Sequence, residues 1–307
     1  METRVLPFND DAIAEAARLI LAGEPVAVPT ETVYGLAADA TNAEAVARIY
    51  EAKGRPIFNP LIVHVSDILE AQQLGHFDAQ AHGLANEHWP GPLTLVLPLT
   101  EGSGIASIVT AGLPTIGLRV PSHPAMQALL RAVRRPLAAP SANLSGSISP
   151  TRAGHVLKSL GGRIPLIVDG GATQRGLEST IVAATGGLLR LLRPGPIDVE
   201  AENPSGAQIE APGQLASHYA PSKPLRLNAI SAAADEYLIG FGAVAGDSSL
   251  SLSGDLVGAA SRLFDLLHQA DASAKPRIAV ASVPEHGLGA AINDRLQRAA
   301  AGGRSAN

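Results

Sequence analysis

Hydrophobic and polar positions along the 307-residue chain follow two different periods. Apolar side chains recur at spacings of three and four residues over 10–22, 41–54 and 124–133, which predicts amphipathic helices. Short runs rich in Val, Ile and Leu predict buried β-strands; they are residues 25–29, 60–65, 93–97, 115–120, 165–169 and 188–193. Strands that alternate with helices indicate an α/β fold built on a twisted, partly parallel sheet.

The second predicted helix carries a start signal and a stop signal. Thr41 and Glu44 have the spacing of a capping box, and Gly54 is the residue type that ends helices in a left-handed conformation. Lys53 then belongs to the last helical turn, and Arg55 belongs to the loop that leads into the next strand. The dipole of the helix favours cations here, so these two residues alone do not establish a site.

The pattern lapses over residues 198–225, which are rich in Pro and Gly and have no period. It resumes as a strand at 236–242, a helix at 253–272, a strand at 276–283 and a helix after Gly287. A structureless stretch of about 20 residues in a compact protein indicates a linker or a functional loop. We therefore predict two domains, residues 1–200 and 223–307, joined by a linker at 201–222.

Composition and charge narrow the possible functions. The chain has no cysteine, which rules out disulfides and thiolate metal sites, and no apolar run approaches the roughly 18 residues of a membrane span. The N-terminus does not resemble a signal peptide, so we expect a cytoplasmic protein with no membrane contact. The net charge of −5 conceals a basic middle third, in which residues 102–197 carry 10 basic and 2 acidic groups. This asymmetry favours a locally held anion, or else attraction between two parts of one fold.

Polar and cationic side chains gather at the ends of the predicted strands. Hydroxyl and amide residues follow strands in "VPTETVYG" (28–35) and "APSANLSGSISPT" (139–151), and Ser or Arg ends the apolar runs at 176–182 and 191–197. Such positions suit a small ligand in an α/β fold. The alternative for 139–151 is a helix-capping loop with Thr151 as the cap. No P-loop, complete dinucleotide fingerprint or His-Glu-x-x-His motif occurs.

Seven segments, in order, resemble the successive motifs of the YrdC-like family. They are "PTETVYGLAADA", "AKGRPIFNPLIVHV", "WPGPLTLVL", "TIGLRVPSHP", "APSANLSGSISPT", "GLESTIV" and "LLRPGPI". The segment "APGQLASHYAPSKPL" before a small second domain is similar to the two-domain members of the family, the threonylcarbamoyl-AMP synthases. The resemblance implies an N-terminal YrdC-like domain with a twisted mixed sheet, and a smaller C-terminal Rossmann-like α/β domain.

The resemblance also implies a reaction. The family's nucleotidyltransferases join L-threonine, bicarbonate (or CO2) and ATP into L-threonylcarbamoyladenylate and release pyrophosphate. A partner transferase then passes the threonylcarbamoyl group to the adenosine next to the anticodon of tRNA. All reactants carry anionic groups, so charge neutralisation and in-line positioning are the main demands on the protein. Mg²⁺ would be held by the ATP phosphates, with no protein metal site and no organic cofactor.

The matched motifs assign residues to two sides of a site. The ATP side would contain Lys53 and Arg55 as catalytic cations, with Asn59, Thr115, Ser141, Asn143, Ser149, Arg193 and Tyr219. The L-threonine side would contain Thr32, His64, Arg119 and Ser179, with Arg119 as the clamp for the carboxylate. By itself, a His in an apolar strand such as "LIVHV" is more often a core histidine, and its place in a matched motif reverses this interpretation for His64. The linker at 201–222 would cover the nucleotide as a lid that excludes water; its alternative is a Pro-rich tether.

Two other functions remain open. One is the formation of a carbamoyl adenylate by a relative of the same fold, although those proteins carry zinc-finger-like and acylphosphatase modules that a cysteine-free chain lacks. The other is an RNA-binding module, against which stand the 3% aromatic content, the four lysines and the overall negative charge. Weak, salt-sensitive tRNA binding is compatible with catalysis.

Overall fold

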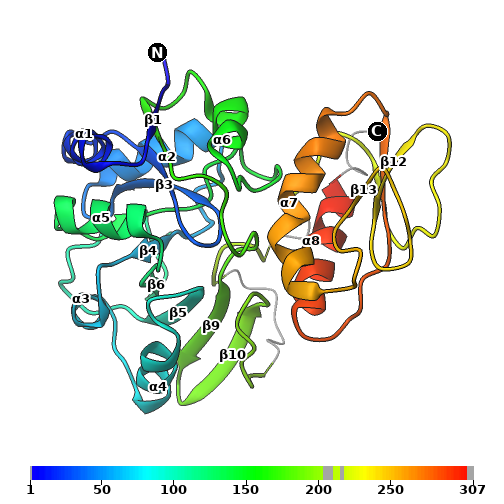
Figure 1. The fold of residues 1–307 in the computed structure, drawn as a ribbon. Coiled ribbons are helices and arrows are strands. Elements are labelled where there is room, and N and C mark those ends of the chain that lie inside the picture. Colours follow the sequence, from blue (N-terminus) through cyan, green and yellow to red (C-terminus); the bar gives the residue numbers. More distant parts are fainter. Residues whose placement is uncertain (1, 203–209, 215–217, 303–307) are drawn as a thin grey trace.

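The computed structural model describes residues 2–202, 210–214 and 218–302 (Figure 1). Parts of the predicted linker, at 203–209 and 215–217, lie outside the described residues. The chain forms a large ten-stranded sheet and a small four-stranded sheet, each flanked by helices. The predicted α/β class with a large and a small sheet is thus confirmed.

The large sheet is mixed. Its strands run, in spatial order, β1 (Arg4–Pro7), β8 (Leu166–Asp169), β2 (Val26–Pro29), β3 (Tyr34–Asp39), β7 (Leu137–Ala138), β4 (Ile62–His64), β6 (Thr115–Arg119), β5 (Leu93–Pro98), β9 (Thr180–Thr185) and β10 (Leu188–Arg193). The pairs β1–β8, β8–β2, β4–β6 and β5–β9 are parallel, and the other neighbours are antiparallel. The family resemblance correctly implied this mixture.

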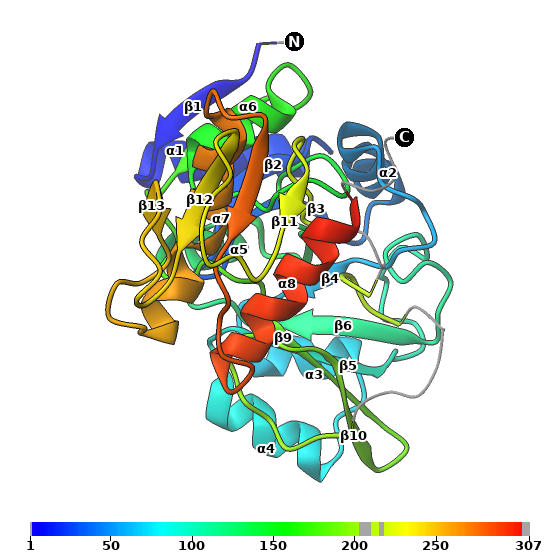
Figure 2. The same ribbon diagram turned by 90° about the vertical axis from the view of Figure 1, so that its right-hand side faces the viewer.

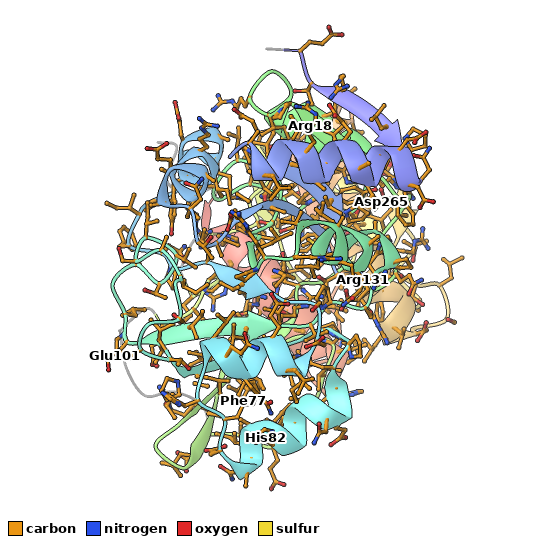
Figure 3. The ribbon with its side chains drawn as sticks, turned by 90° about the vertical axis from the view of Figure 1, so that its left-hand side faces the viewer. Arg18, Phe77, His82, Glu101, Arg131 and Asp265 are labelled. Carbon is orange, nitrogen blue, oxygen red and sulfur yellow. The ribbon has the colours of Figure 1, made fainter. Side chains whose placement is uncertain are left out.

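Helices cover both faces of the large sheet. They are α1 (Asp10–Leu21), α2 (Ala43–Lys53), α3 (Ile68–Leu74), α4 (Ala79–His88), α5 (Pro124–Val133) and α6 (Ala153–Leu160). Val26 and Val28 of β2 pack in the cluster with α1 and α5, whereas Ala27 between them packs in the cluster with α2 and α6. Because successive strand residues point to opposite faces, these two clusters lie on opposite sides of the sheet. Figure 3 shows Arg18 and Arg131 on the outer surfaces of α1 and α5.

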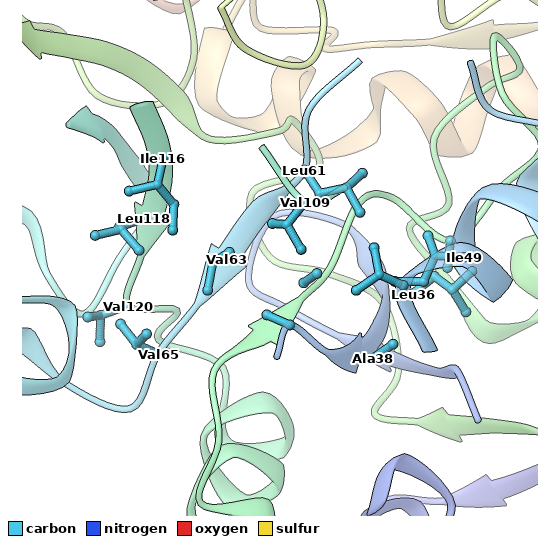
Figure 4. Packing of buried hydrophobic residues seen from close by; sticks show 14 of the residues in the cluster. Leu36, Ala38, Ile49, Leu61, Val63, Val65, Val109, Ile116, Leu118 and Val120 are labelled. Atoms are coloured by element: carbon cyan, nitrogen blue, oxygen red, sulfur yellow. The ribbon is translucent and has the colours of Figure 1, made fainter. Parts of the chain in front are cut away.

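The same alternation occurs in the neighbouring strands β4 and β6, where it places two polar side chains on the face opposite to the hydrophobic cluster. Val63 together with Ile116 and Leu118 belongs to the hydrophobic cluster shown in Figure 4. The intervening residues of these strands, His64 and Arg119, are buried on the other face. Two polar side chains inside apolar strands therefore form a face of their own, and are not scattered through the core.

The start of α2 differs from the prediction. Asn42 is the N-cap residue, and its side chain accepts hydrogen bonds from the amides of Glu44 and Ala45. The Thr41 hydroxyl instead donates to Asp39 Oδ1 at 2.7 Å. The capping box predicted from Thr41 and Glu44 is therefore wrong, because Asn is at least as good a cap as Thr and Asp39 competes for the hydroxyl.

The end of α2 agrees with the prediction. Gly54 is the C-cap in the left-handed conformation, with φ of 59°. Lys53 is the last residue of the helix, and Arg55 is the first residue past its cap. This turn directs both cations toward the buried interior, where their side chains are almost fully inaccessible to solvent.

The small sheet is entirely parallel. Its strands run in the spatial order β11 (Leu225–Arg226), β14 (Arg277–Val280), β12 (Glu236–Gly240) and β13 (Ser248–Ser249), with helices α7 (Leu256–Ala272) and α8 (Leu288–Gly302). In Figure 1 α7 stands between this sheet and the large domain, and Figure 2 shows α8 crossing beside β11. This is the α/β unit expected of a small Rossmann-like domain. Among the described residues, no helix is both long and apolar enough to cross a membrane.

The hydrophobic core of the small domain extends into the large one. Val33, Ile148 and Leu177 of the large domain pack in the same cluster as α7 and α8. Gly176 lies so close to α7 that an added Cβ would stand 2.4 Å from the Ser261 carbonyl oxygen. The two domains are therefore packed against each other through shared apolar contacts, as well as joined by a linker.

Candidate active site

A cavity opens where the polar faces of the strands meet the linker. Eight of the thirteen residues predicted from the sequence line it: Thr32, Arg55, His64, Arg119, Ser141, Ser179, Arg193 and Tyr219. They come from segments as far apart as 32 and 219, which the fold brings together around one space. The assignment of individual roles within this space stays a prediction.

Five predicted residues do not line the cavity. Three of them, Lys53, Asn143 and Ser149, are buried behind the residues that line it. Lys53 and Asn143 hydrogen-bond residues of the 139–151 loop, part of which lines the cavity, and Ser149 hydrogen-bonds the cavity residue Glu178. Asn59 is buried, with its Oδ1 unpartnered among the described residues. Thr115 lies on the same face of β6 as Arg119 and four positions away, about 13 Å along the strand.

The alternative for the loop at 139–151 is wrong in one respect. The N-cap position of α6 is Arg152, and no side chain caps that end of the helix. Thr151 is therefore not a cap. The loop is instead held by its own hydrogen bonds, among them Asn143 Nδ2 to the Ser147 carbonyl at 2.8 Å.

Lys53 holds this loop in place through hydrogen bonds. Its Nζ donates to the Ser141 carbonyl at 2.5 Å, to the Asn143 carbonyl at 2.6 Å and to Asn143 Oδ1 at 3.5 Å. These contacts occupy all three N–H donors of the ammonium group. Burial, and then the nearby Arg55, holds the pKa of Lys53 well below its ordinary value.

Arg55 and Arg193 are buried cations on the wall of the cavity. Arg55 donates to the carbonyls of Asn59 and Pro60 at 3.2 and 2.9 Å. Arg193 donates from Nη2 to the Ser179 carbonyl at 2.9 Å and to Ser179 Oγ at 3.1 Å. Burial lowers the pKa of both, to about 10 for Arg55. No carboxylate of the described residues lies within ion-pair distance of either.

Arg119 has a carboxylate partner, which the sequence analysis did not foresee. Its Nη2 lies 2.6 Å from Glu31 Oε1, Nη1 donates to Thr32 Oγ1 at 3.0 Å, and Nε donates to the Gly91 carbonyl at 3.2 Å. Burial would raise the pKa of Glu31, but Arg119 outweighs burial and lowers it. A guanidinium has five N–H donors, so these three bonds leave two for a ligand.

His64 faces the same part of the cavity as a neutral ring. Burial, and then the charge of Arg119, lowers its pKa to about 3. Its Nδ1 is buried and has no hydrogen-bond partner among the described residues. A buried polar atom without a partner is unfavourable unless a ligand or water completes it, so a hydrogen-bonding partner is expected at this atom.

The linker closes the remaining side of the cavity. Pro212, Gly213, His218 and Tyr219 all line it. The Tyr219 side chain is fully buried, its hydroxyl has no partner among the described residues, and burial raises its pKa. The neighbouring His218 is also buried and has its pKa held well below the ordinary value, first by burial.

Several residues in and around this cavity are not among those predicted from the sequence. Glu31, Glu178 and His218 lie inside motifs that were recognised, next to the residues that were assigned. Arg295, which contacts Glu178, lies outside every motif, and its only signal is a charged residue in the buried stripe that Ile292 and Leu296 form on α8. A charge on an apolar stripe is a usable sign of a buried partner elsewhere in the fold.

The described residues contain no group of three or more His, Asp and Glu side chains that could hold a metal ion. Glu178 lines the cavity and Glu31 bonds the cavity residue Arg119, so each of these carboxylates is paired with an arginine. A cavity whose walls are rich in buried cations and hydroxyls, and poor in free carboxylates, suits anionic ligands. Fold and cavity together define an α/β protein with a cation-lined cavity and a second α/β domain packed against the first.

Comparisons with known proteins identify the family. The family model described as "Telomere recombination", for the Sua5, YciO and YrdC domain, matches residues 18–195. The model for the threonylcarbamoyl-AMP synthase C-terminal domain matches residues 173–301. The chain belongs to the Sua5–YciO–YrdC family, and within it to the two-domain threonylcarbamoyl-AMP synthase type.

Individual relatives agree with this identification over nearly the whole chain. The threonylcarbamoyl-AMP synthase of Bacillus subtilis (strain 168) is 41% identical over 98% of this chain and 96% of its own length. The crystal structure of Pyrococcus abyssi Sua5 complexed with L-threonine superposes with a TM-score of 0.89 at 35% identity, over 99% of this chain and 98% of that one. Escherichia coli YciO matches 65% of this chain with a TM-score of 0.58 at 25% identity.

Proposed function

We propose that this protein is an L-threonylcarbamoyladenylate synthase, which converts L-threonine, bicarbonate and ATP into threonylcarbamoyl-AMP and pyrophosphate. The observation that carries the proposal is the charge of the cavity. Three buried cations, Lys53, Arg55 and Arg193, have no carboxylate within ion-pair distance among the described residues. Unneutralised buried charge is unfavourable, and the phosphates of ATP would supply the missing anions.

The reaction has two steps, and each requires that the protein hold the reacting groups in position. The amine of threonine adds to CO2 and loses a proton, or condenses with bicarbonate and releases water, to give an N-carboxylate. This N-carboxylate then attacks the α-phosphorus of ATP as pyrophosphate leaves. Arg55 and Arg193 lie on the cavity wall and would bind the triphosphate. Lys53 would act from behind, through the loop that carries Ser141 and Asn143. We assign Asn59, Thr115 and Ser149 to the same nucleotide side.

The threonine side is proposed to consist of Thr32, His64, Arg119 and Ser179. Two N–H donors of Arg119 are free for a carboxylate, and the neutral ring of His64 offers a hydrogen-bonding atom. The Ser179 hydroxyl bonds Thr94 Oγ1 at 2.8 Å and is held in place by Arg193. The solved P. abyssi relative has been crystallised with L-threonine, which supports this class of ligand.

Other parts of the proposal concern partners and location. The described linker residues at 210–214 and 218–222 would exclude water from the adenylate, which hydrolyses readily. Mg²⁺ would enter bound to ATP, because Glu178 on the cavity wall and Glu31 beside Arg119 are both engaged by arginines. The product would pass to a transferase that acts on tRNA, so we place the protein in the cytoplasm, with only weak, salt-dependent tRNA binding of its own.

The test is the dependence of turnover on all three substrates. Purified protein should release pyrophosphate and form threonylcarbamoyl-AMP, detected by mass, only when ATP, L-threonine and bicarbonate are all present. Arg55→Met should lower kcat/KM for ATP by about 100-fold or more. Arg131→Met makes the same chemical change on the exposed surface of α5 and should have no effect. Pyrophosphate release without threonine, or equal activity of the two variants, would refute the proposal.

A further inference from the structure

The small domain places one arginine, Arg295, behind the wall of the active site. Arg295 lies in the buried stripe of α8 and is completely buried. Its Nε donates to Glu178 Oε2 at 3.0 Å, and its Nη1 donates to the Pro194 carbonyl at 2.7 Å. Glu178 and Pro194 belong to two separate segments of the large domain, so this side chain ties both segments to the small domain.

Glu178 connects Arg295 to the cavity. It lines the cavity, and its Oε1 accepts a hydrogen bond from the hydroxyl of Ser149, which we assign to the nucleotide side. The Ser149 carbonyl in turn accepts a hydrogen bond from His268 Nε2 of α7 at 3.2 Å. Ser149 is thus held at its side chain and at its backbone by residues that depend on the small domain.

The same arginine also contacts the linker. Its guanidinium carbon lies 5.5 Å from the centre of the Tyr219 ring, within the range of a cation–π interaction. The ring also packs against Phe264 of α7, with centroids 5.6 Å apart. Tyr219 has a φ of 63°, an unfavourable conformation that surrounding contacts must hold. Its place on the cavity wall therefore depends on both helices of the small domain.

Stability alone does not explain an ion pair at this place. Burial opposes a charge on Arg295, although Tyr219 and the carboxylates of Glu178 and Asp294 together outweigh burial and raise its pKa above the ordinary value. Its Nη2 has no hydrogen-bond partner among the described residues. Apolar residues of similar volume commonly stabilise such a position as well or better. What an arginine offers here, and an apolar residue does not, is simultaneous orientation of Glu178 and Tyr219.

We propose that Arg295 is a positioning residue for the nucleotide side of the site, and that the small domain acts in the reaction through it. This inference rests on the proposed synthase function and goes beyond it, because it assigns a role to a residue and a domain outside all the recognised motifs. Arg295 does not touch the cavity; it fixes Glu178, and hence Ser149, from one side and Tyr219 from the other.

The first measurement reports on the linker and needs no turnover. The amide of Ala220 donates to the Gly146 carbonyl at 2.8 Å, which ties the residue after Tyr219 to the large domain. In Arg295→Met we expect hydrogen exchange of the Ala220 amide to accelerate about tenfold or more, because Tyr219 loses a contact that holds it. The control is Arg277→Met, which removes an exposed arginine of the same domain that pairs with Asp235. That variant should leave the exchange rate unchanged.

The second measurement separates positioning from stability. Arg295→Met leaves the Glu178 carboxylate buried without its partner and should lower the unfolding midpoint. The double variant Arg295→Met/Glu178→Gln has neither charge, so its midpoint should recover. Its KM for ATP should remain raised by about tenfold or more, with the KM for L-threonine within about threefold of the wild type. Glu178→Gln alone should keep the slow exchange of Ala220, because Arg295 still contacts Tyr219.

These results discriminate between the possibilities. If the double variant regains both stability and a normal KM for ATP, Arg295 is only structural and the proposal is overturned. Unchanged exchange of Ala220 in Arg295→Met also overturns it, as does an equal rise in the two KM values. If the wild-type protein has no threonine-dependent turnover, the proposed function fails. The exchange rates and a calorimetric titration with ATP then still decide whether Arg295 positions the site.

Discussion

Replacing Gly213 by alanine should displace the linker from the cavity and leave both domains folded. Gly213 has a φ of +91°, in the region that L-residues avoid. A Cβ at this position would stand 2.8 Å from Arg193 Cδ and 3.0 Å from the Tyr219 hydroxyl oxygen. The substitution therefore strains the backbone and also collides with two side chains of the site.

The magnitude follows from these two effects. A left-handed conformation costs an alanine about 1–2 kcal/mol, and an extra methyl group forced into a packed site costs about 1–3 kcal/mol. The sum, about 2–5 kcal/mol, corresponds to roughly a 30- to several-thousand-fold loss of the arrangement in which the linker lines the cavity. We expect this loss to appear in catalysis because Gly213 lies in the linker, outside both sheets.

Gly254 provides a matched control. It has a similar φ of +78°, but an added Cβ would meet nothing within 4 Å, and it lies before α7, away from the cavity. Gly254→Ala therefore carries the backbone strain without the collision. Steady-state assays should show kcat/KM for ATP reduced by about 30-fold or more in Gly213→Ala and unchanged in Gly254→Ala. Full activity of Gly213→Ala would refute the view that the linker completes the site at this contact.

Three further predictions concern buried charges. Arg119→Lys keeps the charge that Glu31 requires but loses the forked donors, so the KM for L-threonine should rise about tenfold or more, while the KM for ATP changes little; equal changes would contradict the carboxylate clamp. Lys53→Met leaves the acceptors of the neighbouring loop unpaired, and a calorimetric titration should show ATP binding weakened by about tenfold or more, with threonine binding nearly unchanged. Burial holds the pKa of His155 and of His268 at about 4, below the ordinary 6.5. The unfolded chain therefore binds more protons, and the free energy of unfolding should fall as the pH drops from about 6.5 to about 4 and level off below that. Urea titrations across this range should show a shallower fall for His155→Phe, and an unchanged slope would contradict the assignment.

Local patterns in the sequence were sufficient to predict the fold class. The period of apolar residues located the helices and strands around the site, and Gly54 located the end of α2 that places Lys53 and Arg55. The error at the start of α2 came from competition between neighbours. Asp39 takes the hydroxyl of Thr41, and Asn42 is free to cap the helix. Such competition among adjacent polar residues is decided by geometry that periodicity does not contain.

The pairing of charges could not be predicted in the same way. Glu31 meets Arg119 across 88 positions of the chain, and Glu178 meets Arg295 across 117. No local pattern encodes contacts between residues so far apart in the sequence. The motifs therefore assigned Arg119 to the site without Glu31, and assigned neither Glu178 nor Arg295. For Lys53, the motif indicated a cation at the site, whereas only the structure shows its ammonium group directed at the carbonyls of Ser141 and Asn143.

These pairings divide the buried cations of the site into two kinds. Arg119 and Arg295 are neutralised by Glu31 and Glu178, so each is held in one orientation and adds little net charge. Arg55, Arg193 and Lys53 bond carbonyl, hydroxyl and amide oxygens, which orient them without cancelling their charge. The field of the cavity is therefore positive where the unpaired cations lie. An enzyme whose substrates are a polyphosphate and an amino acid needs this division, because the triphosphate demands net charge and a single carboxylate demands orientation.

Pairing Arg193 with a new carboxylate, by Ser179→Asp, should therefore weaken ATP binding in a calorimetric titration, whereas Ser179→Asn should not. Equal affinities of the two variants for ATP would contradict the assignment of Arg193 to the triphosphate.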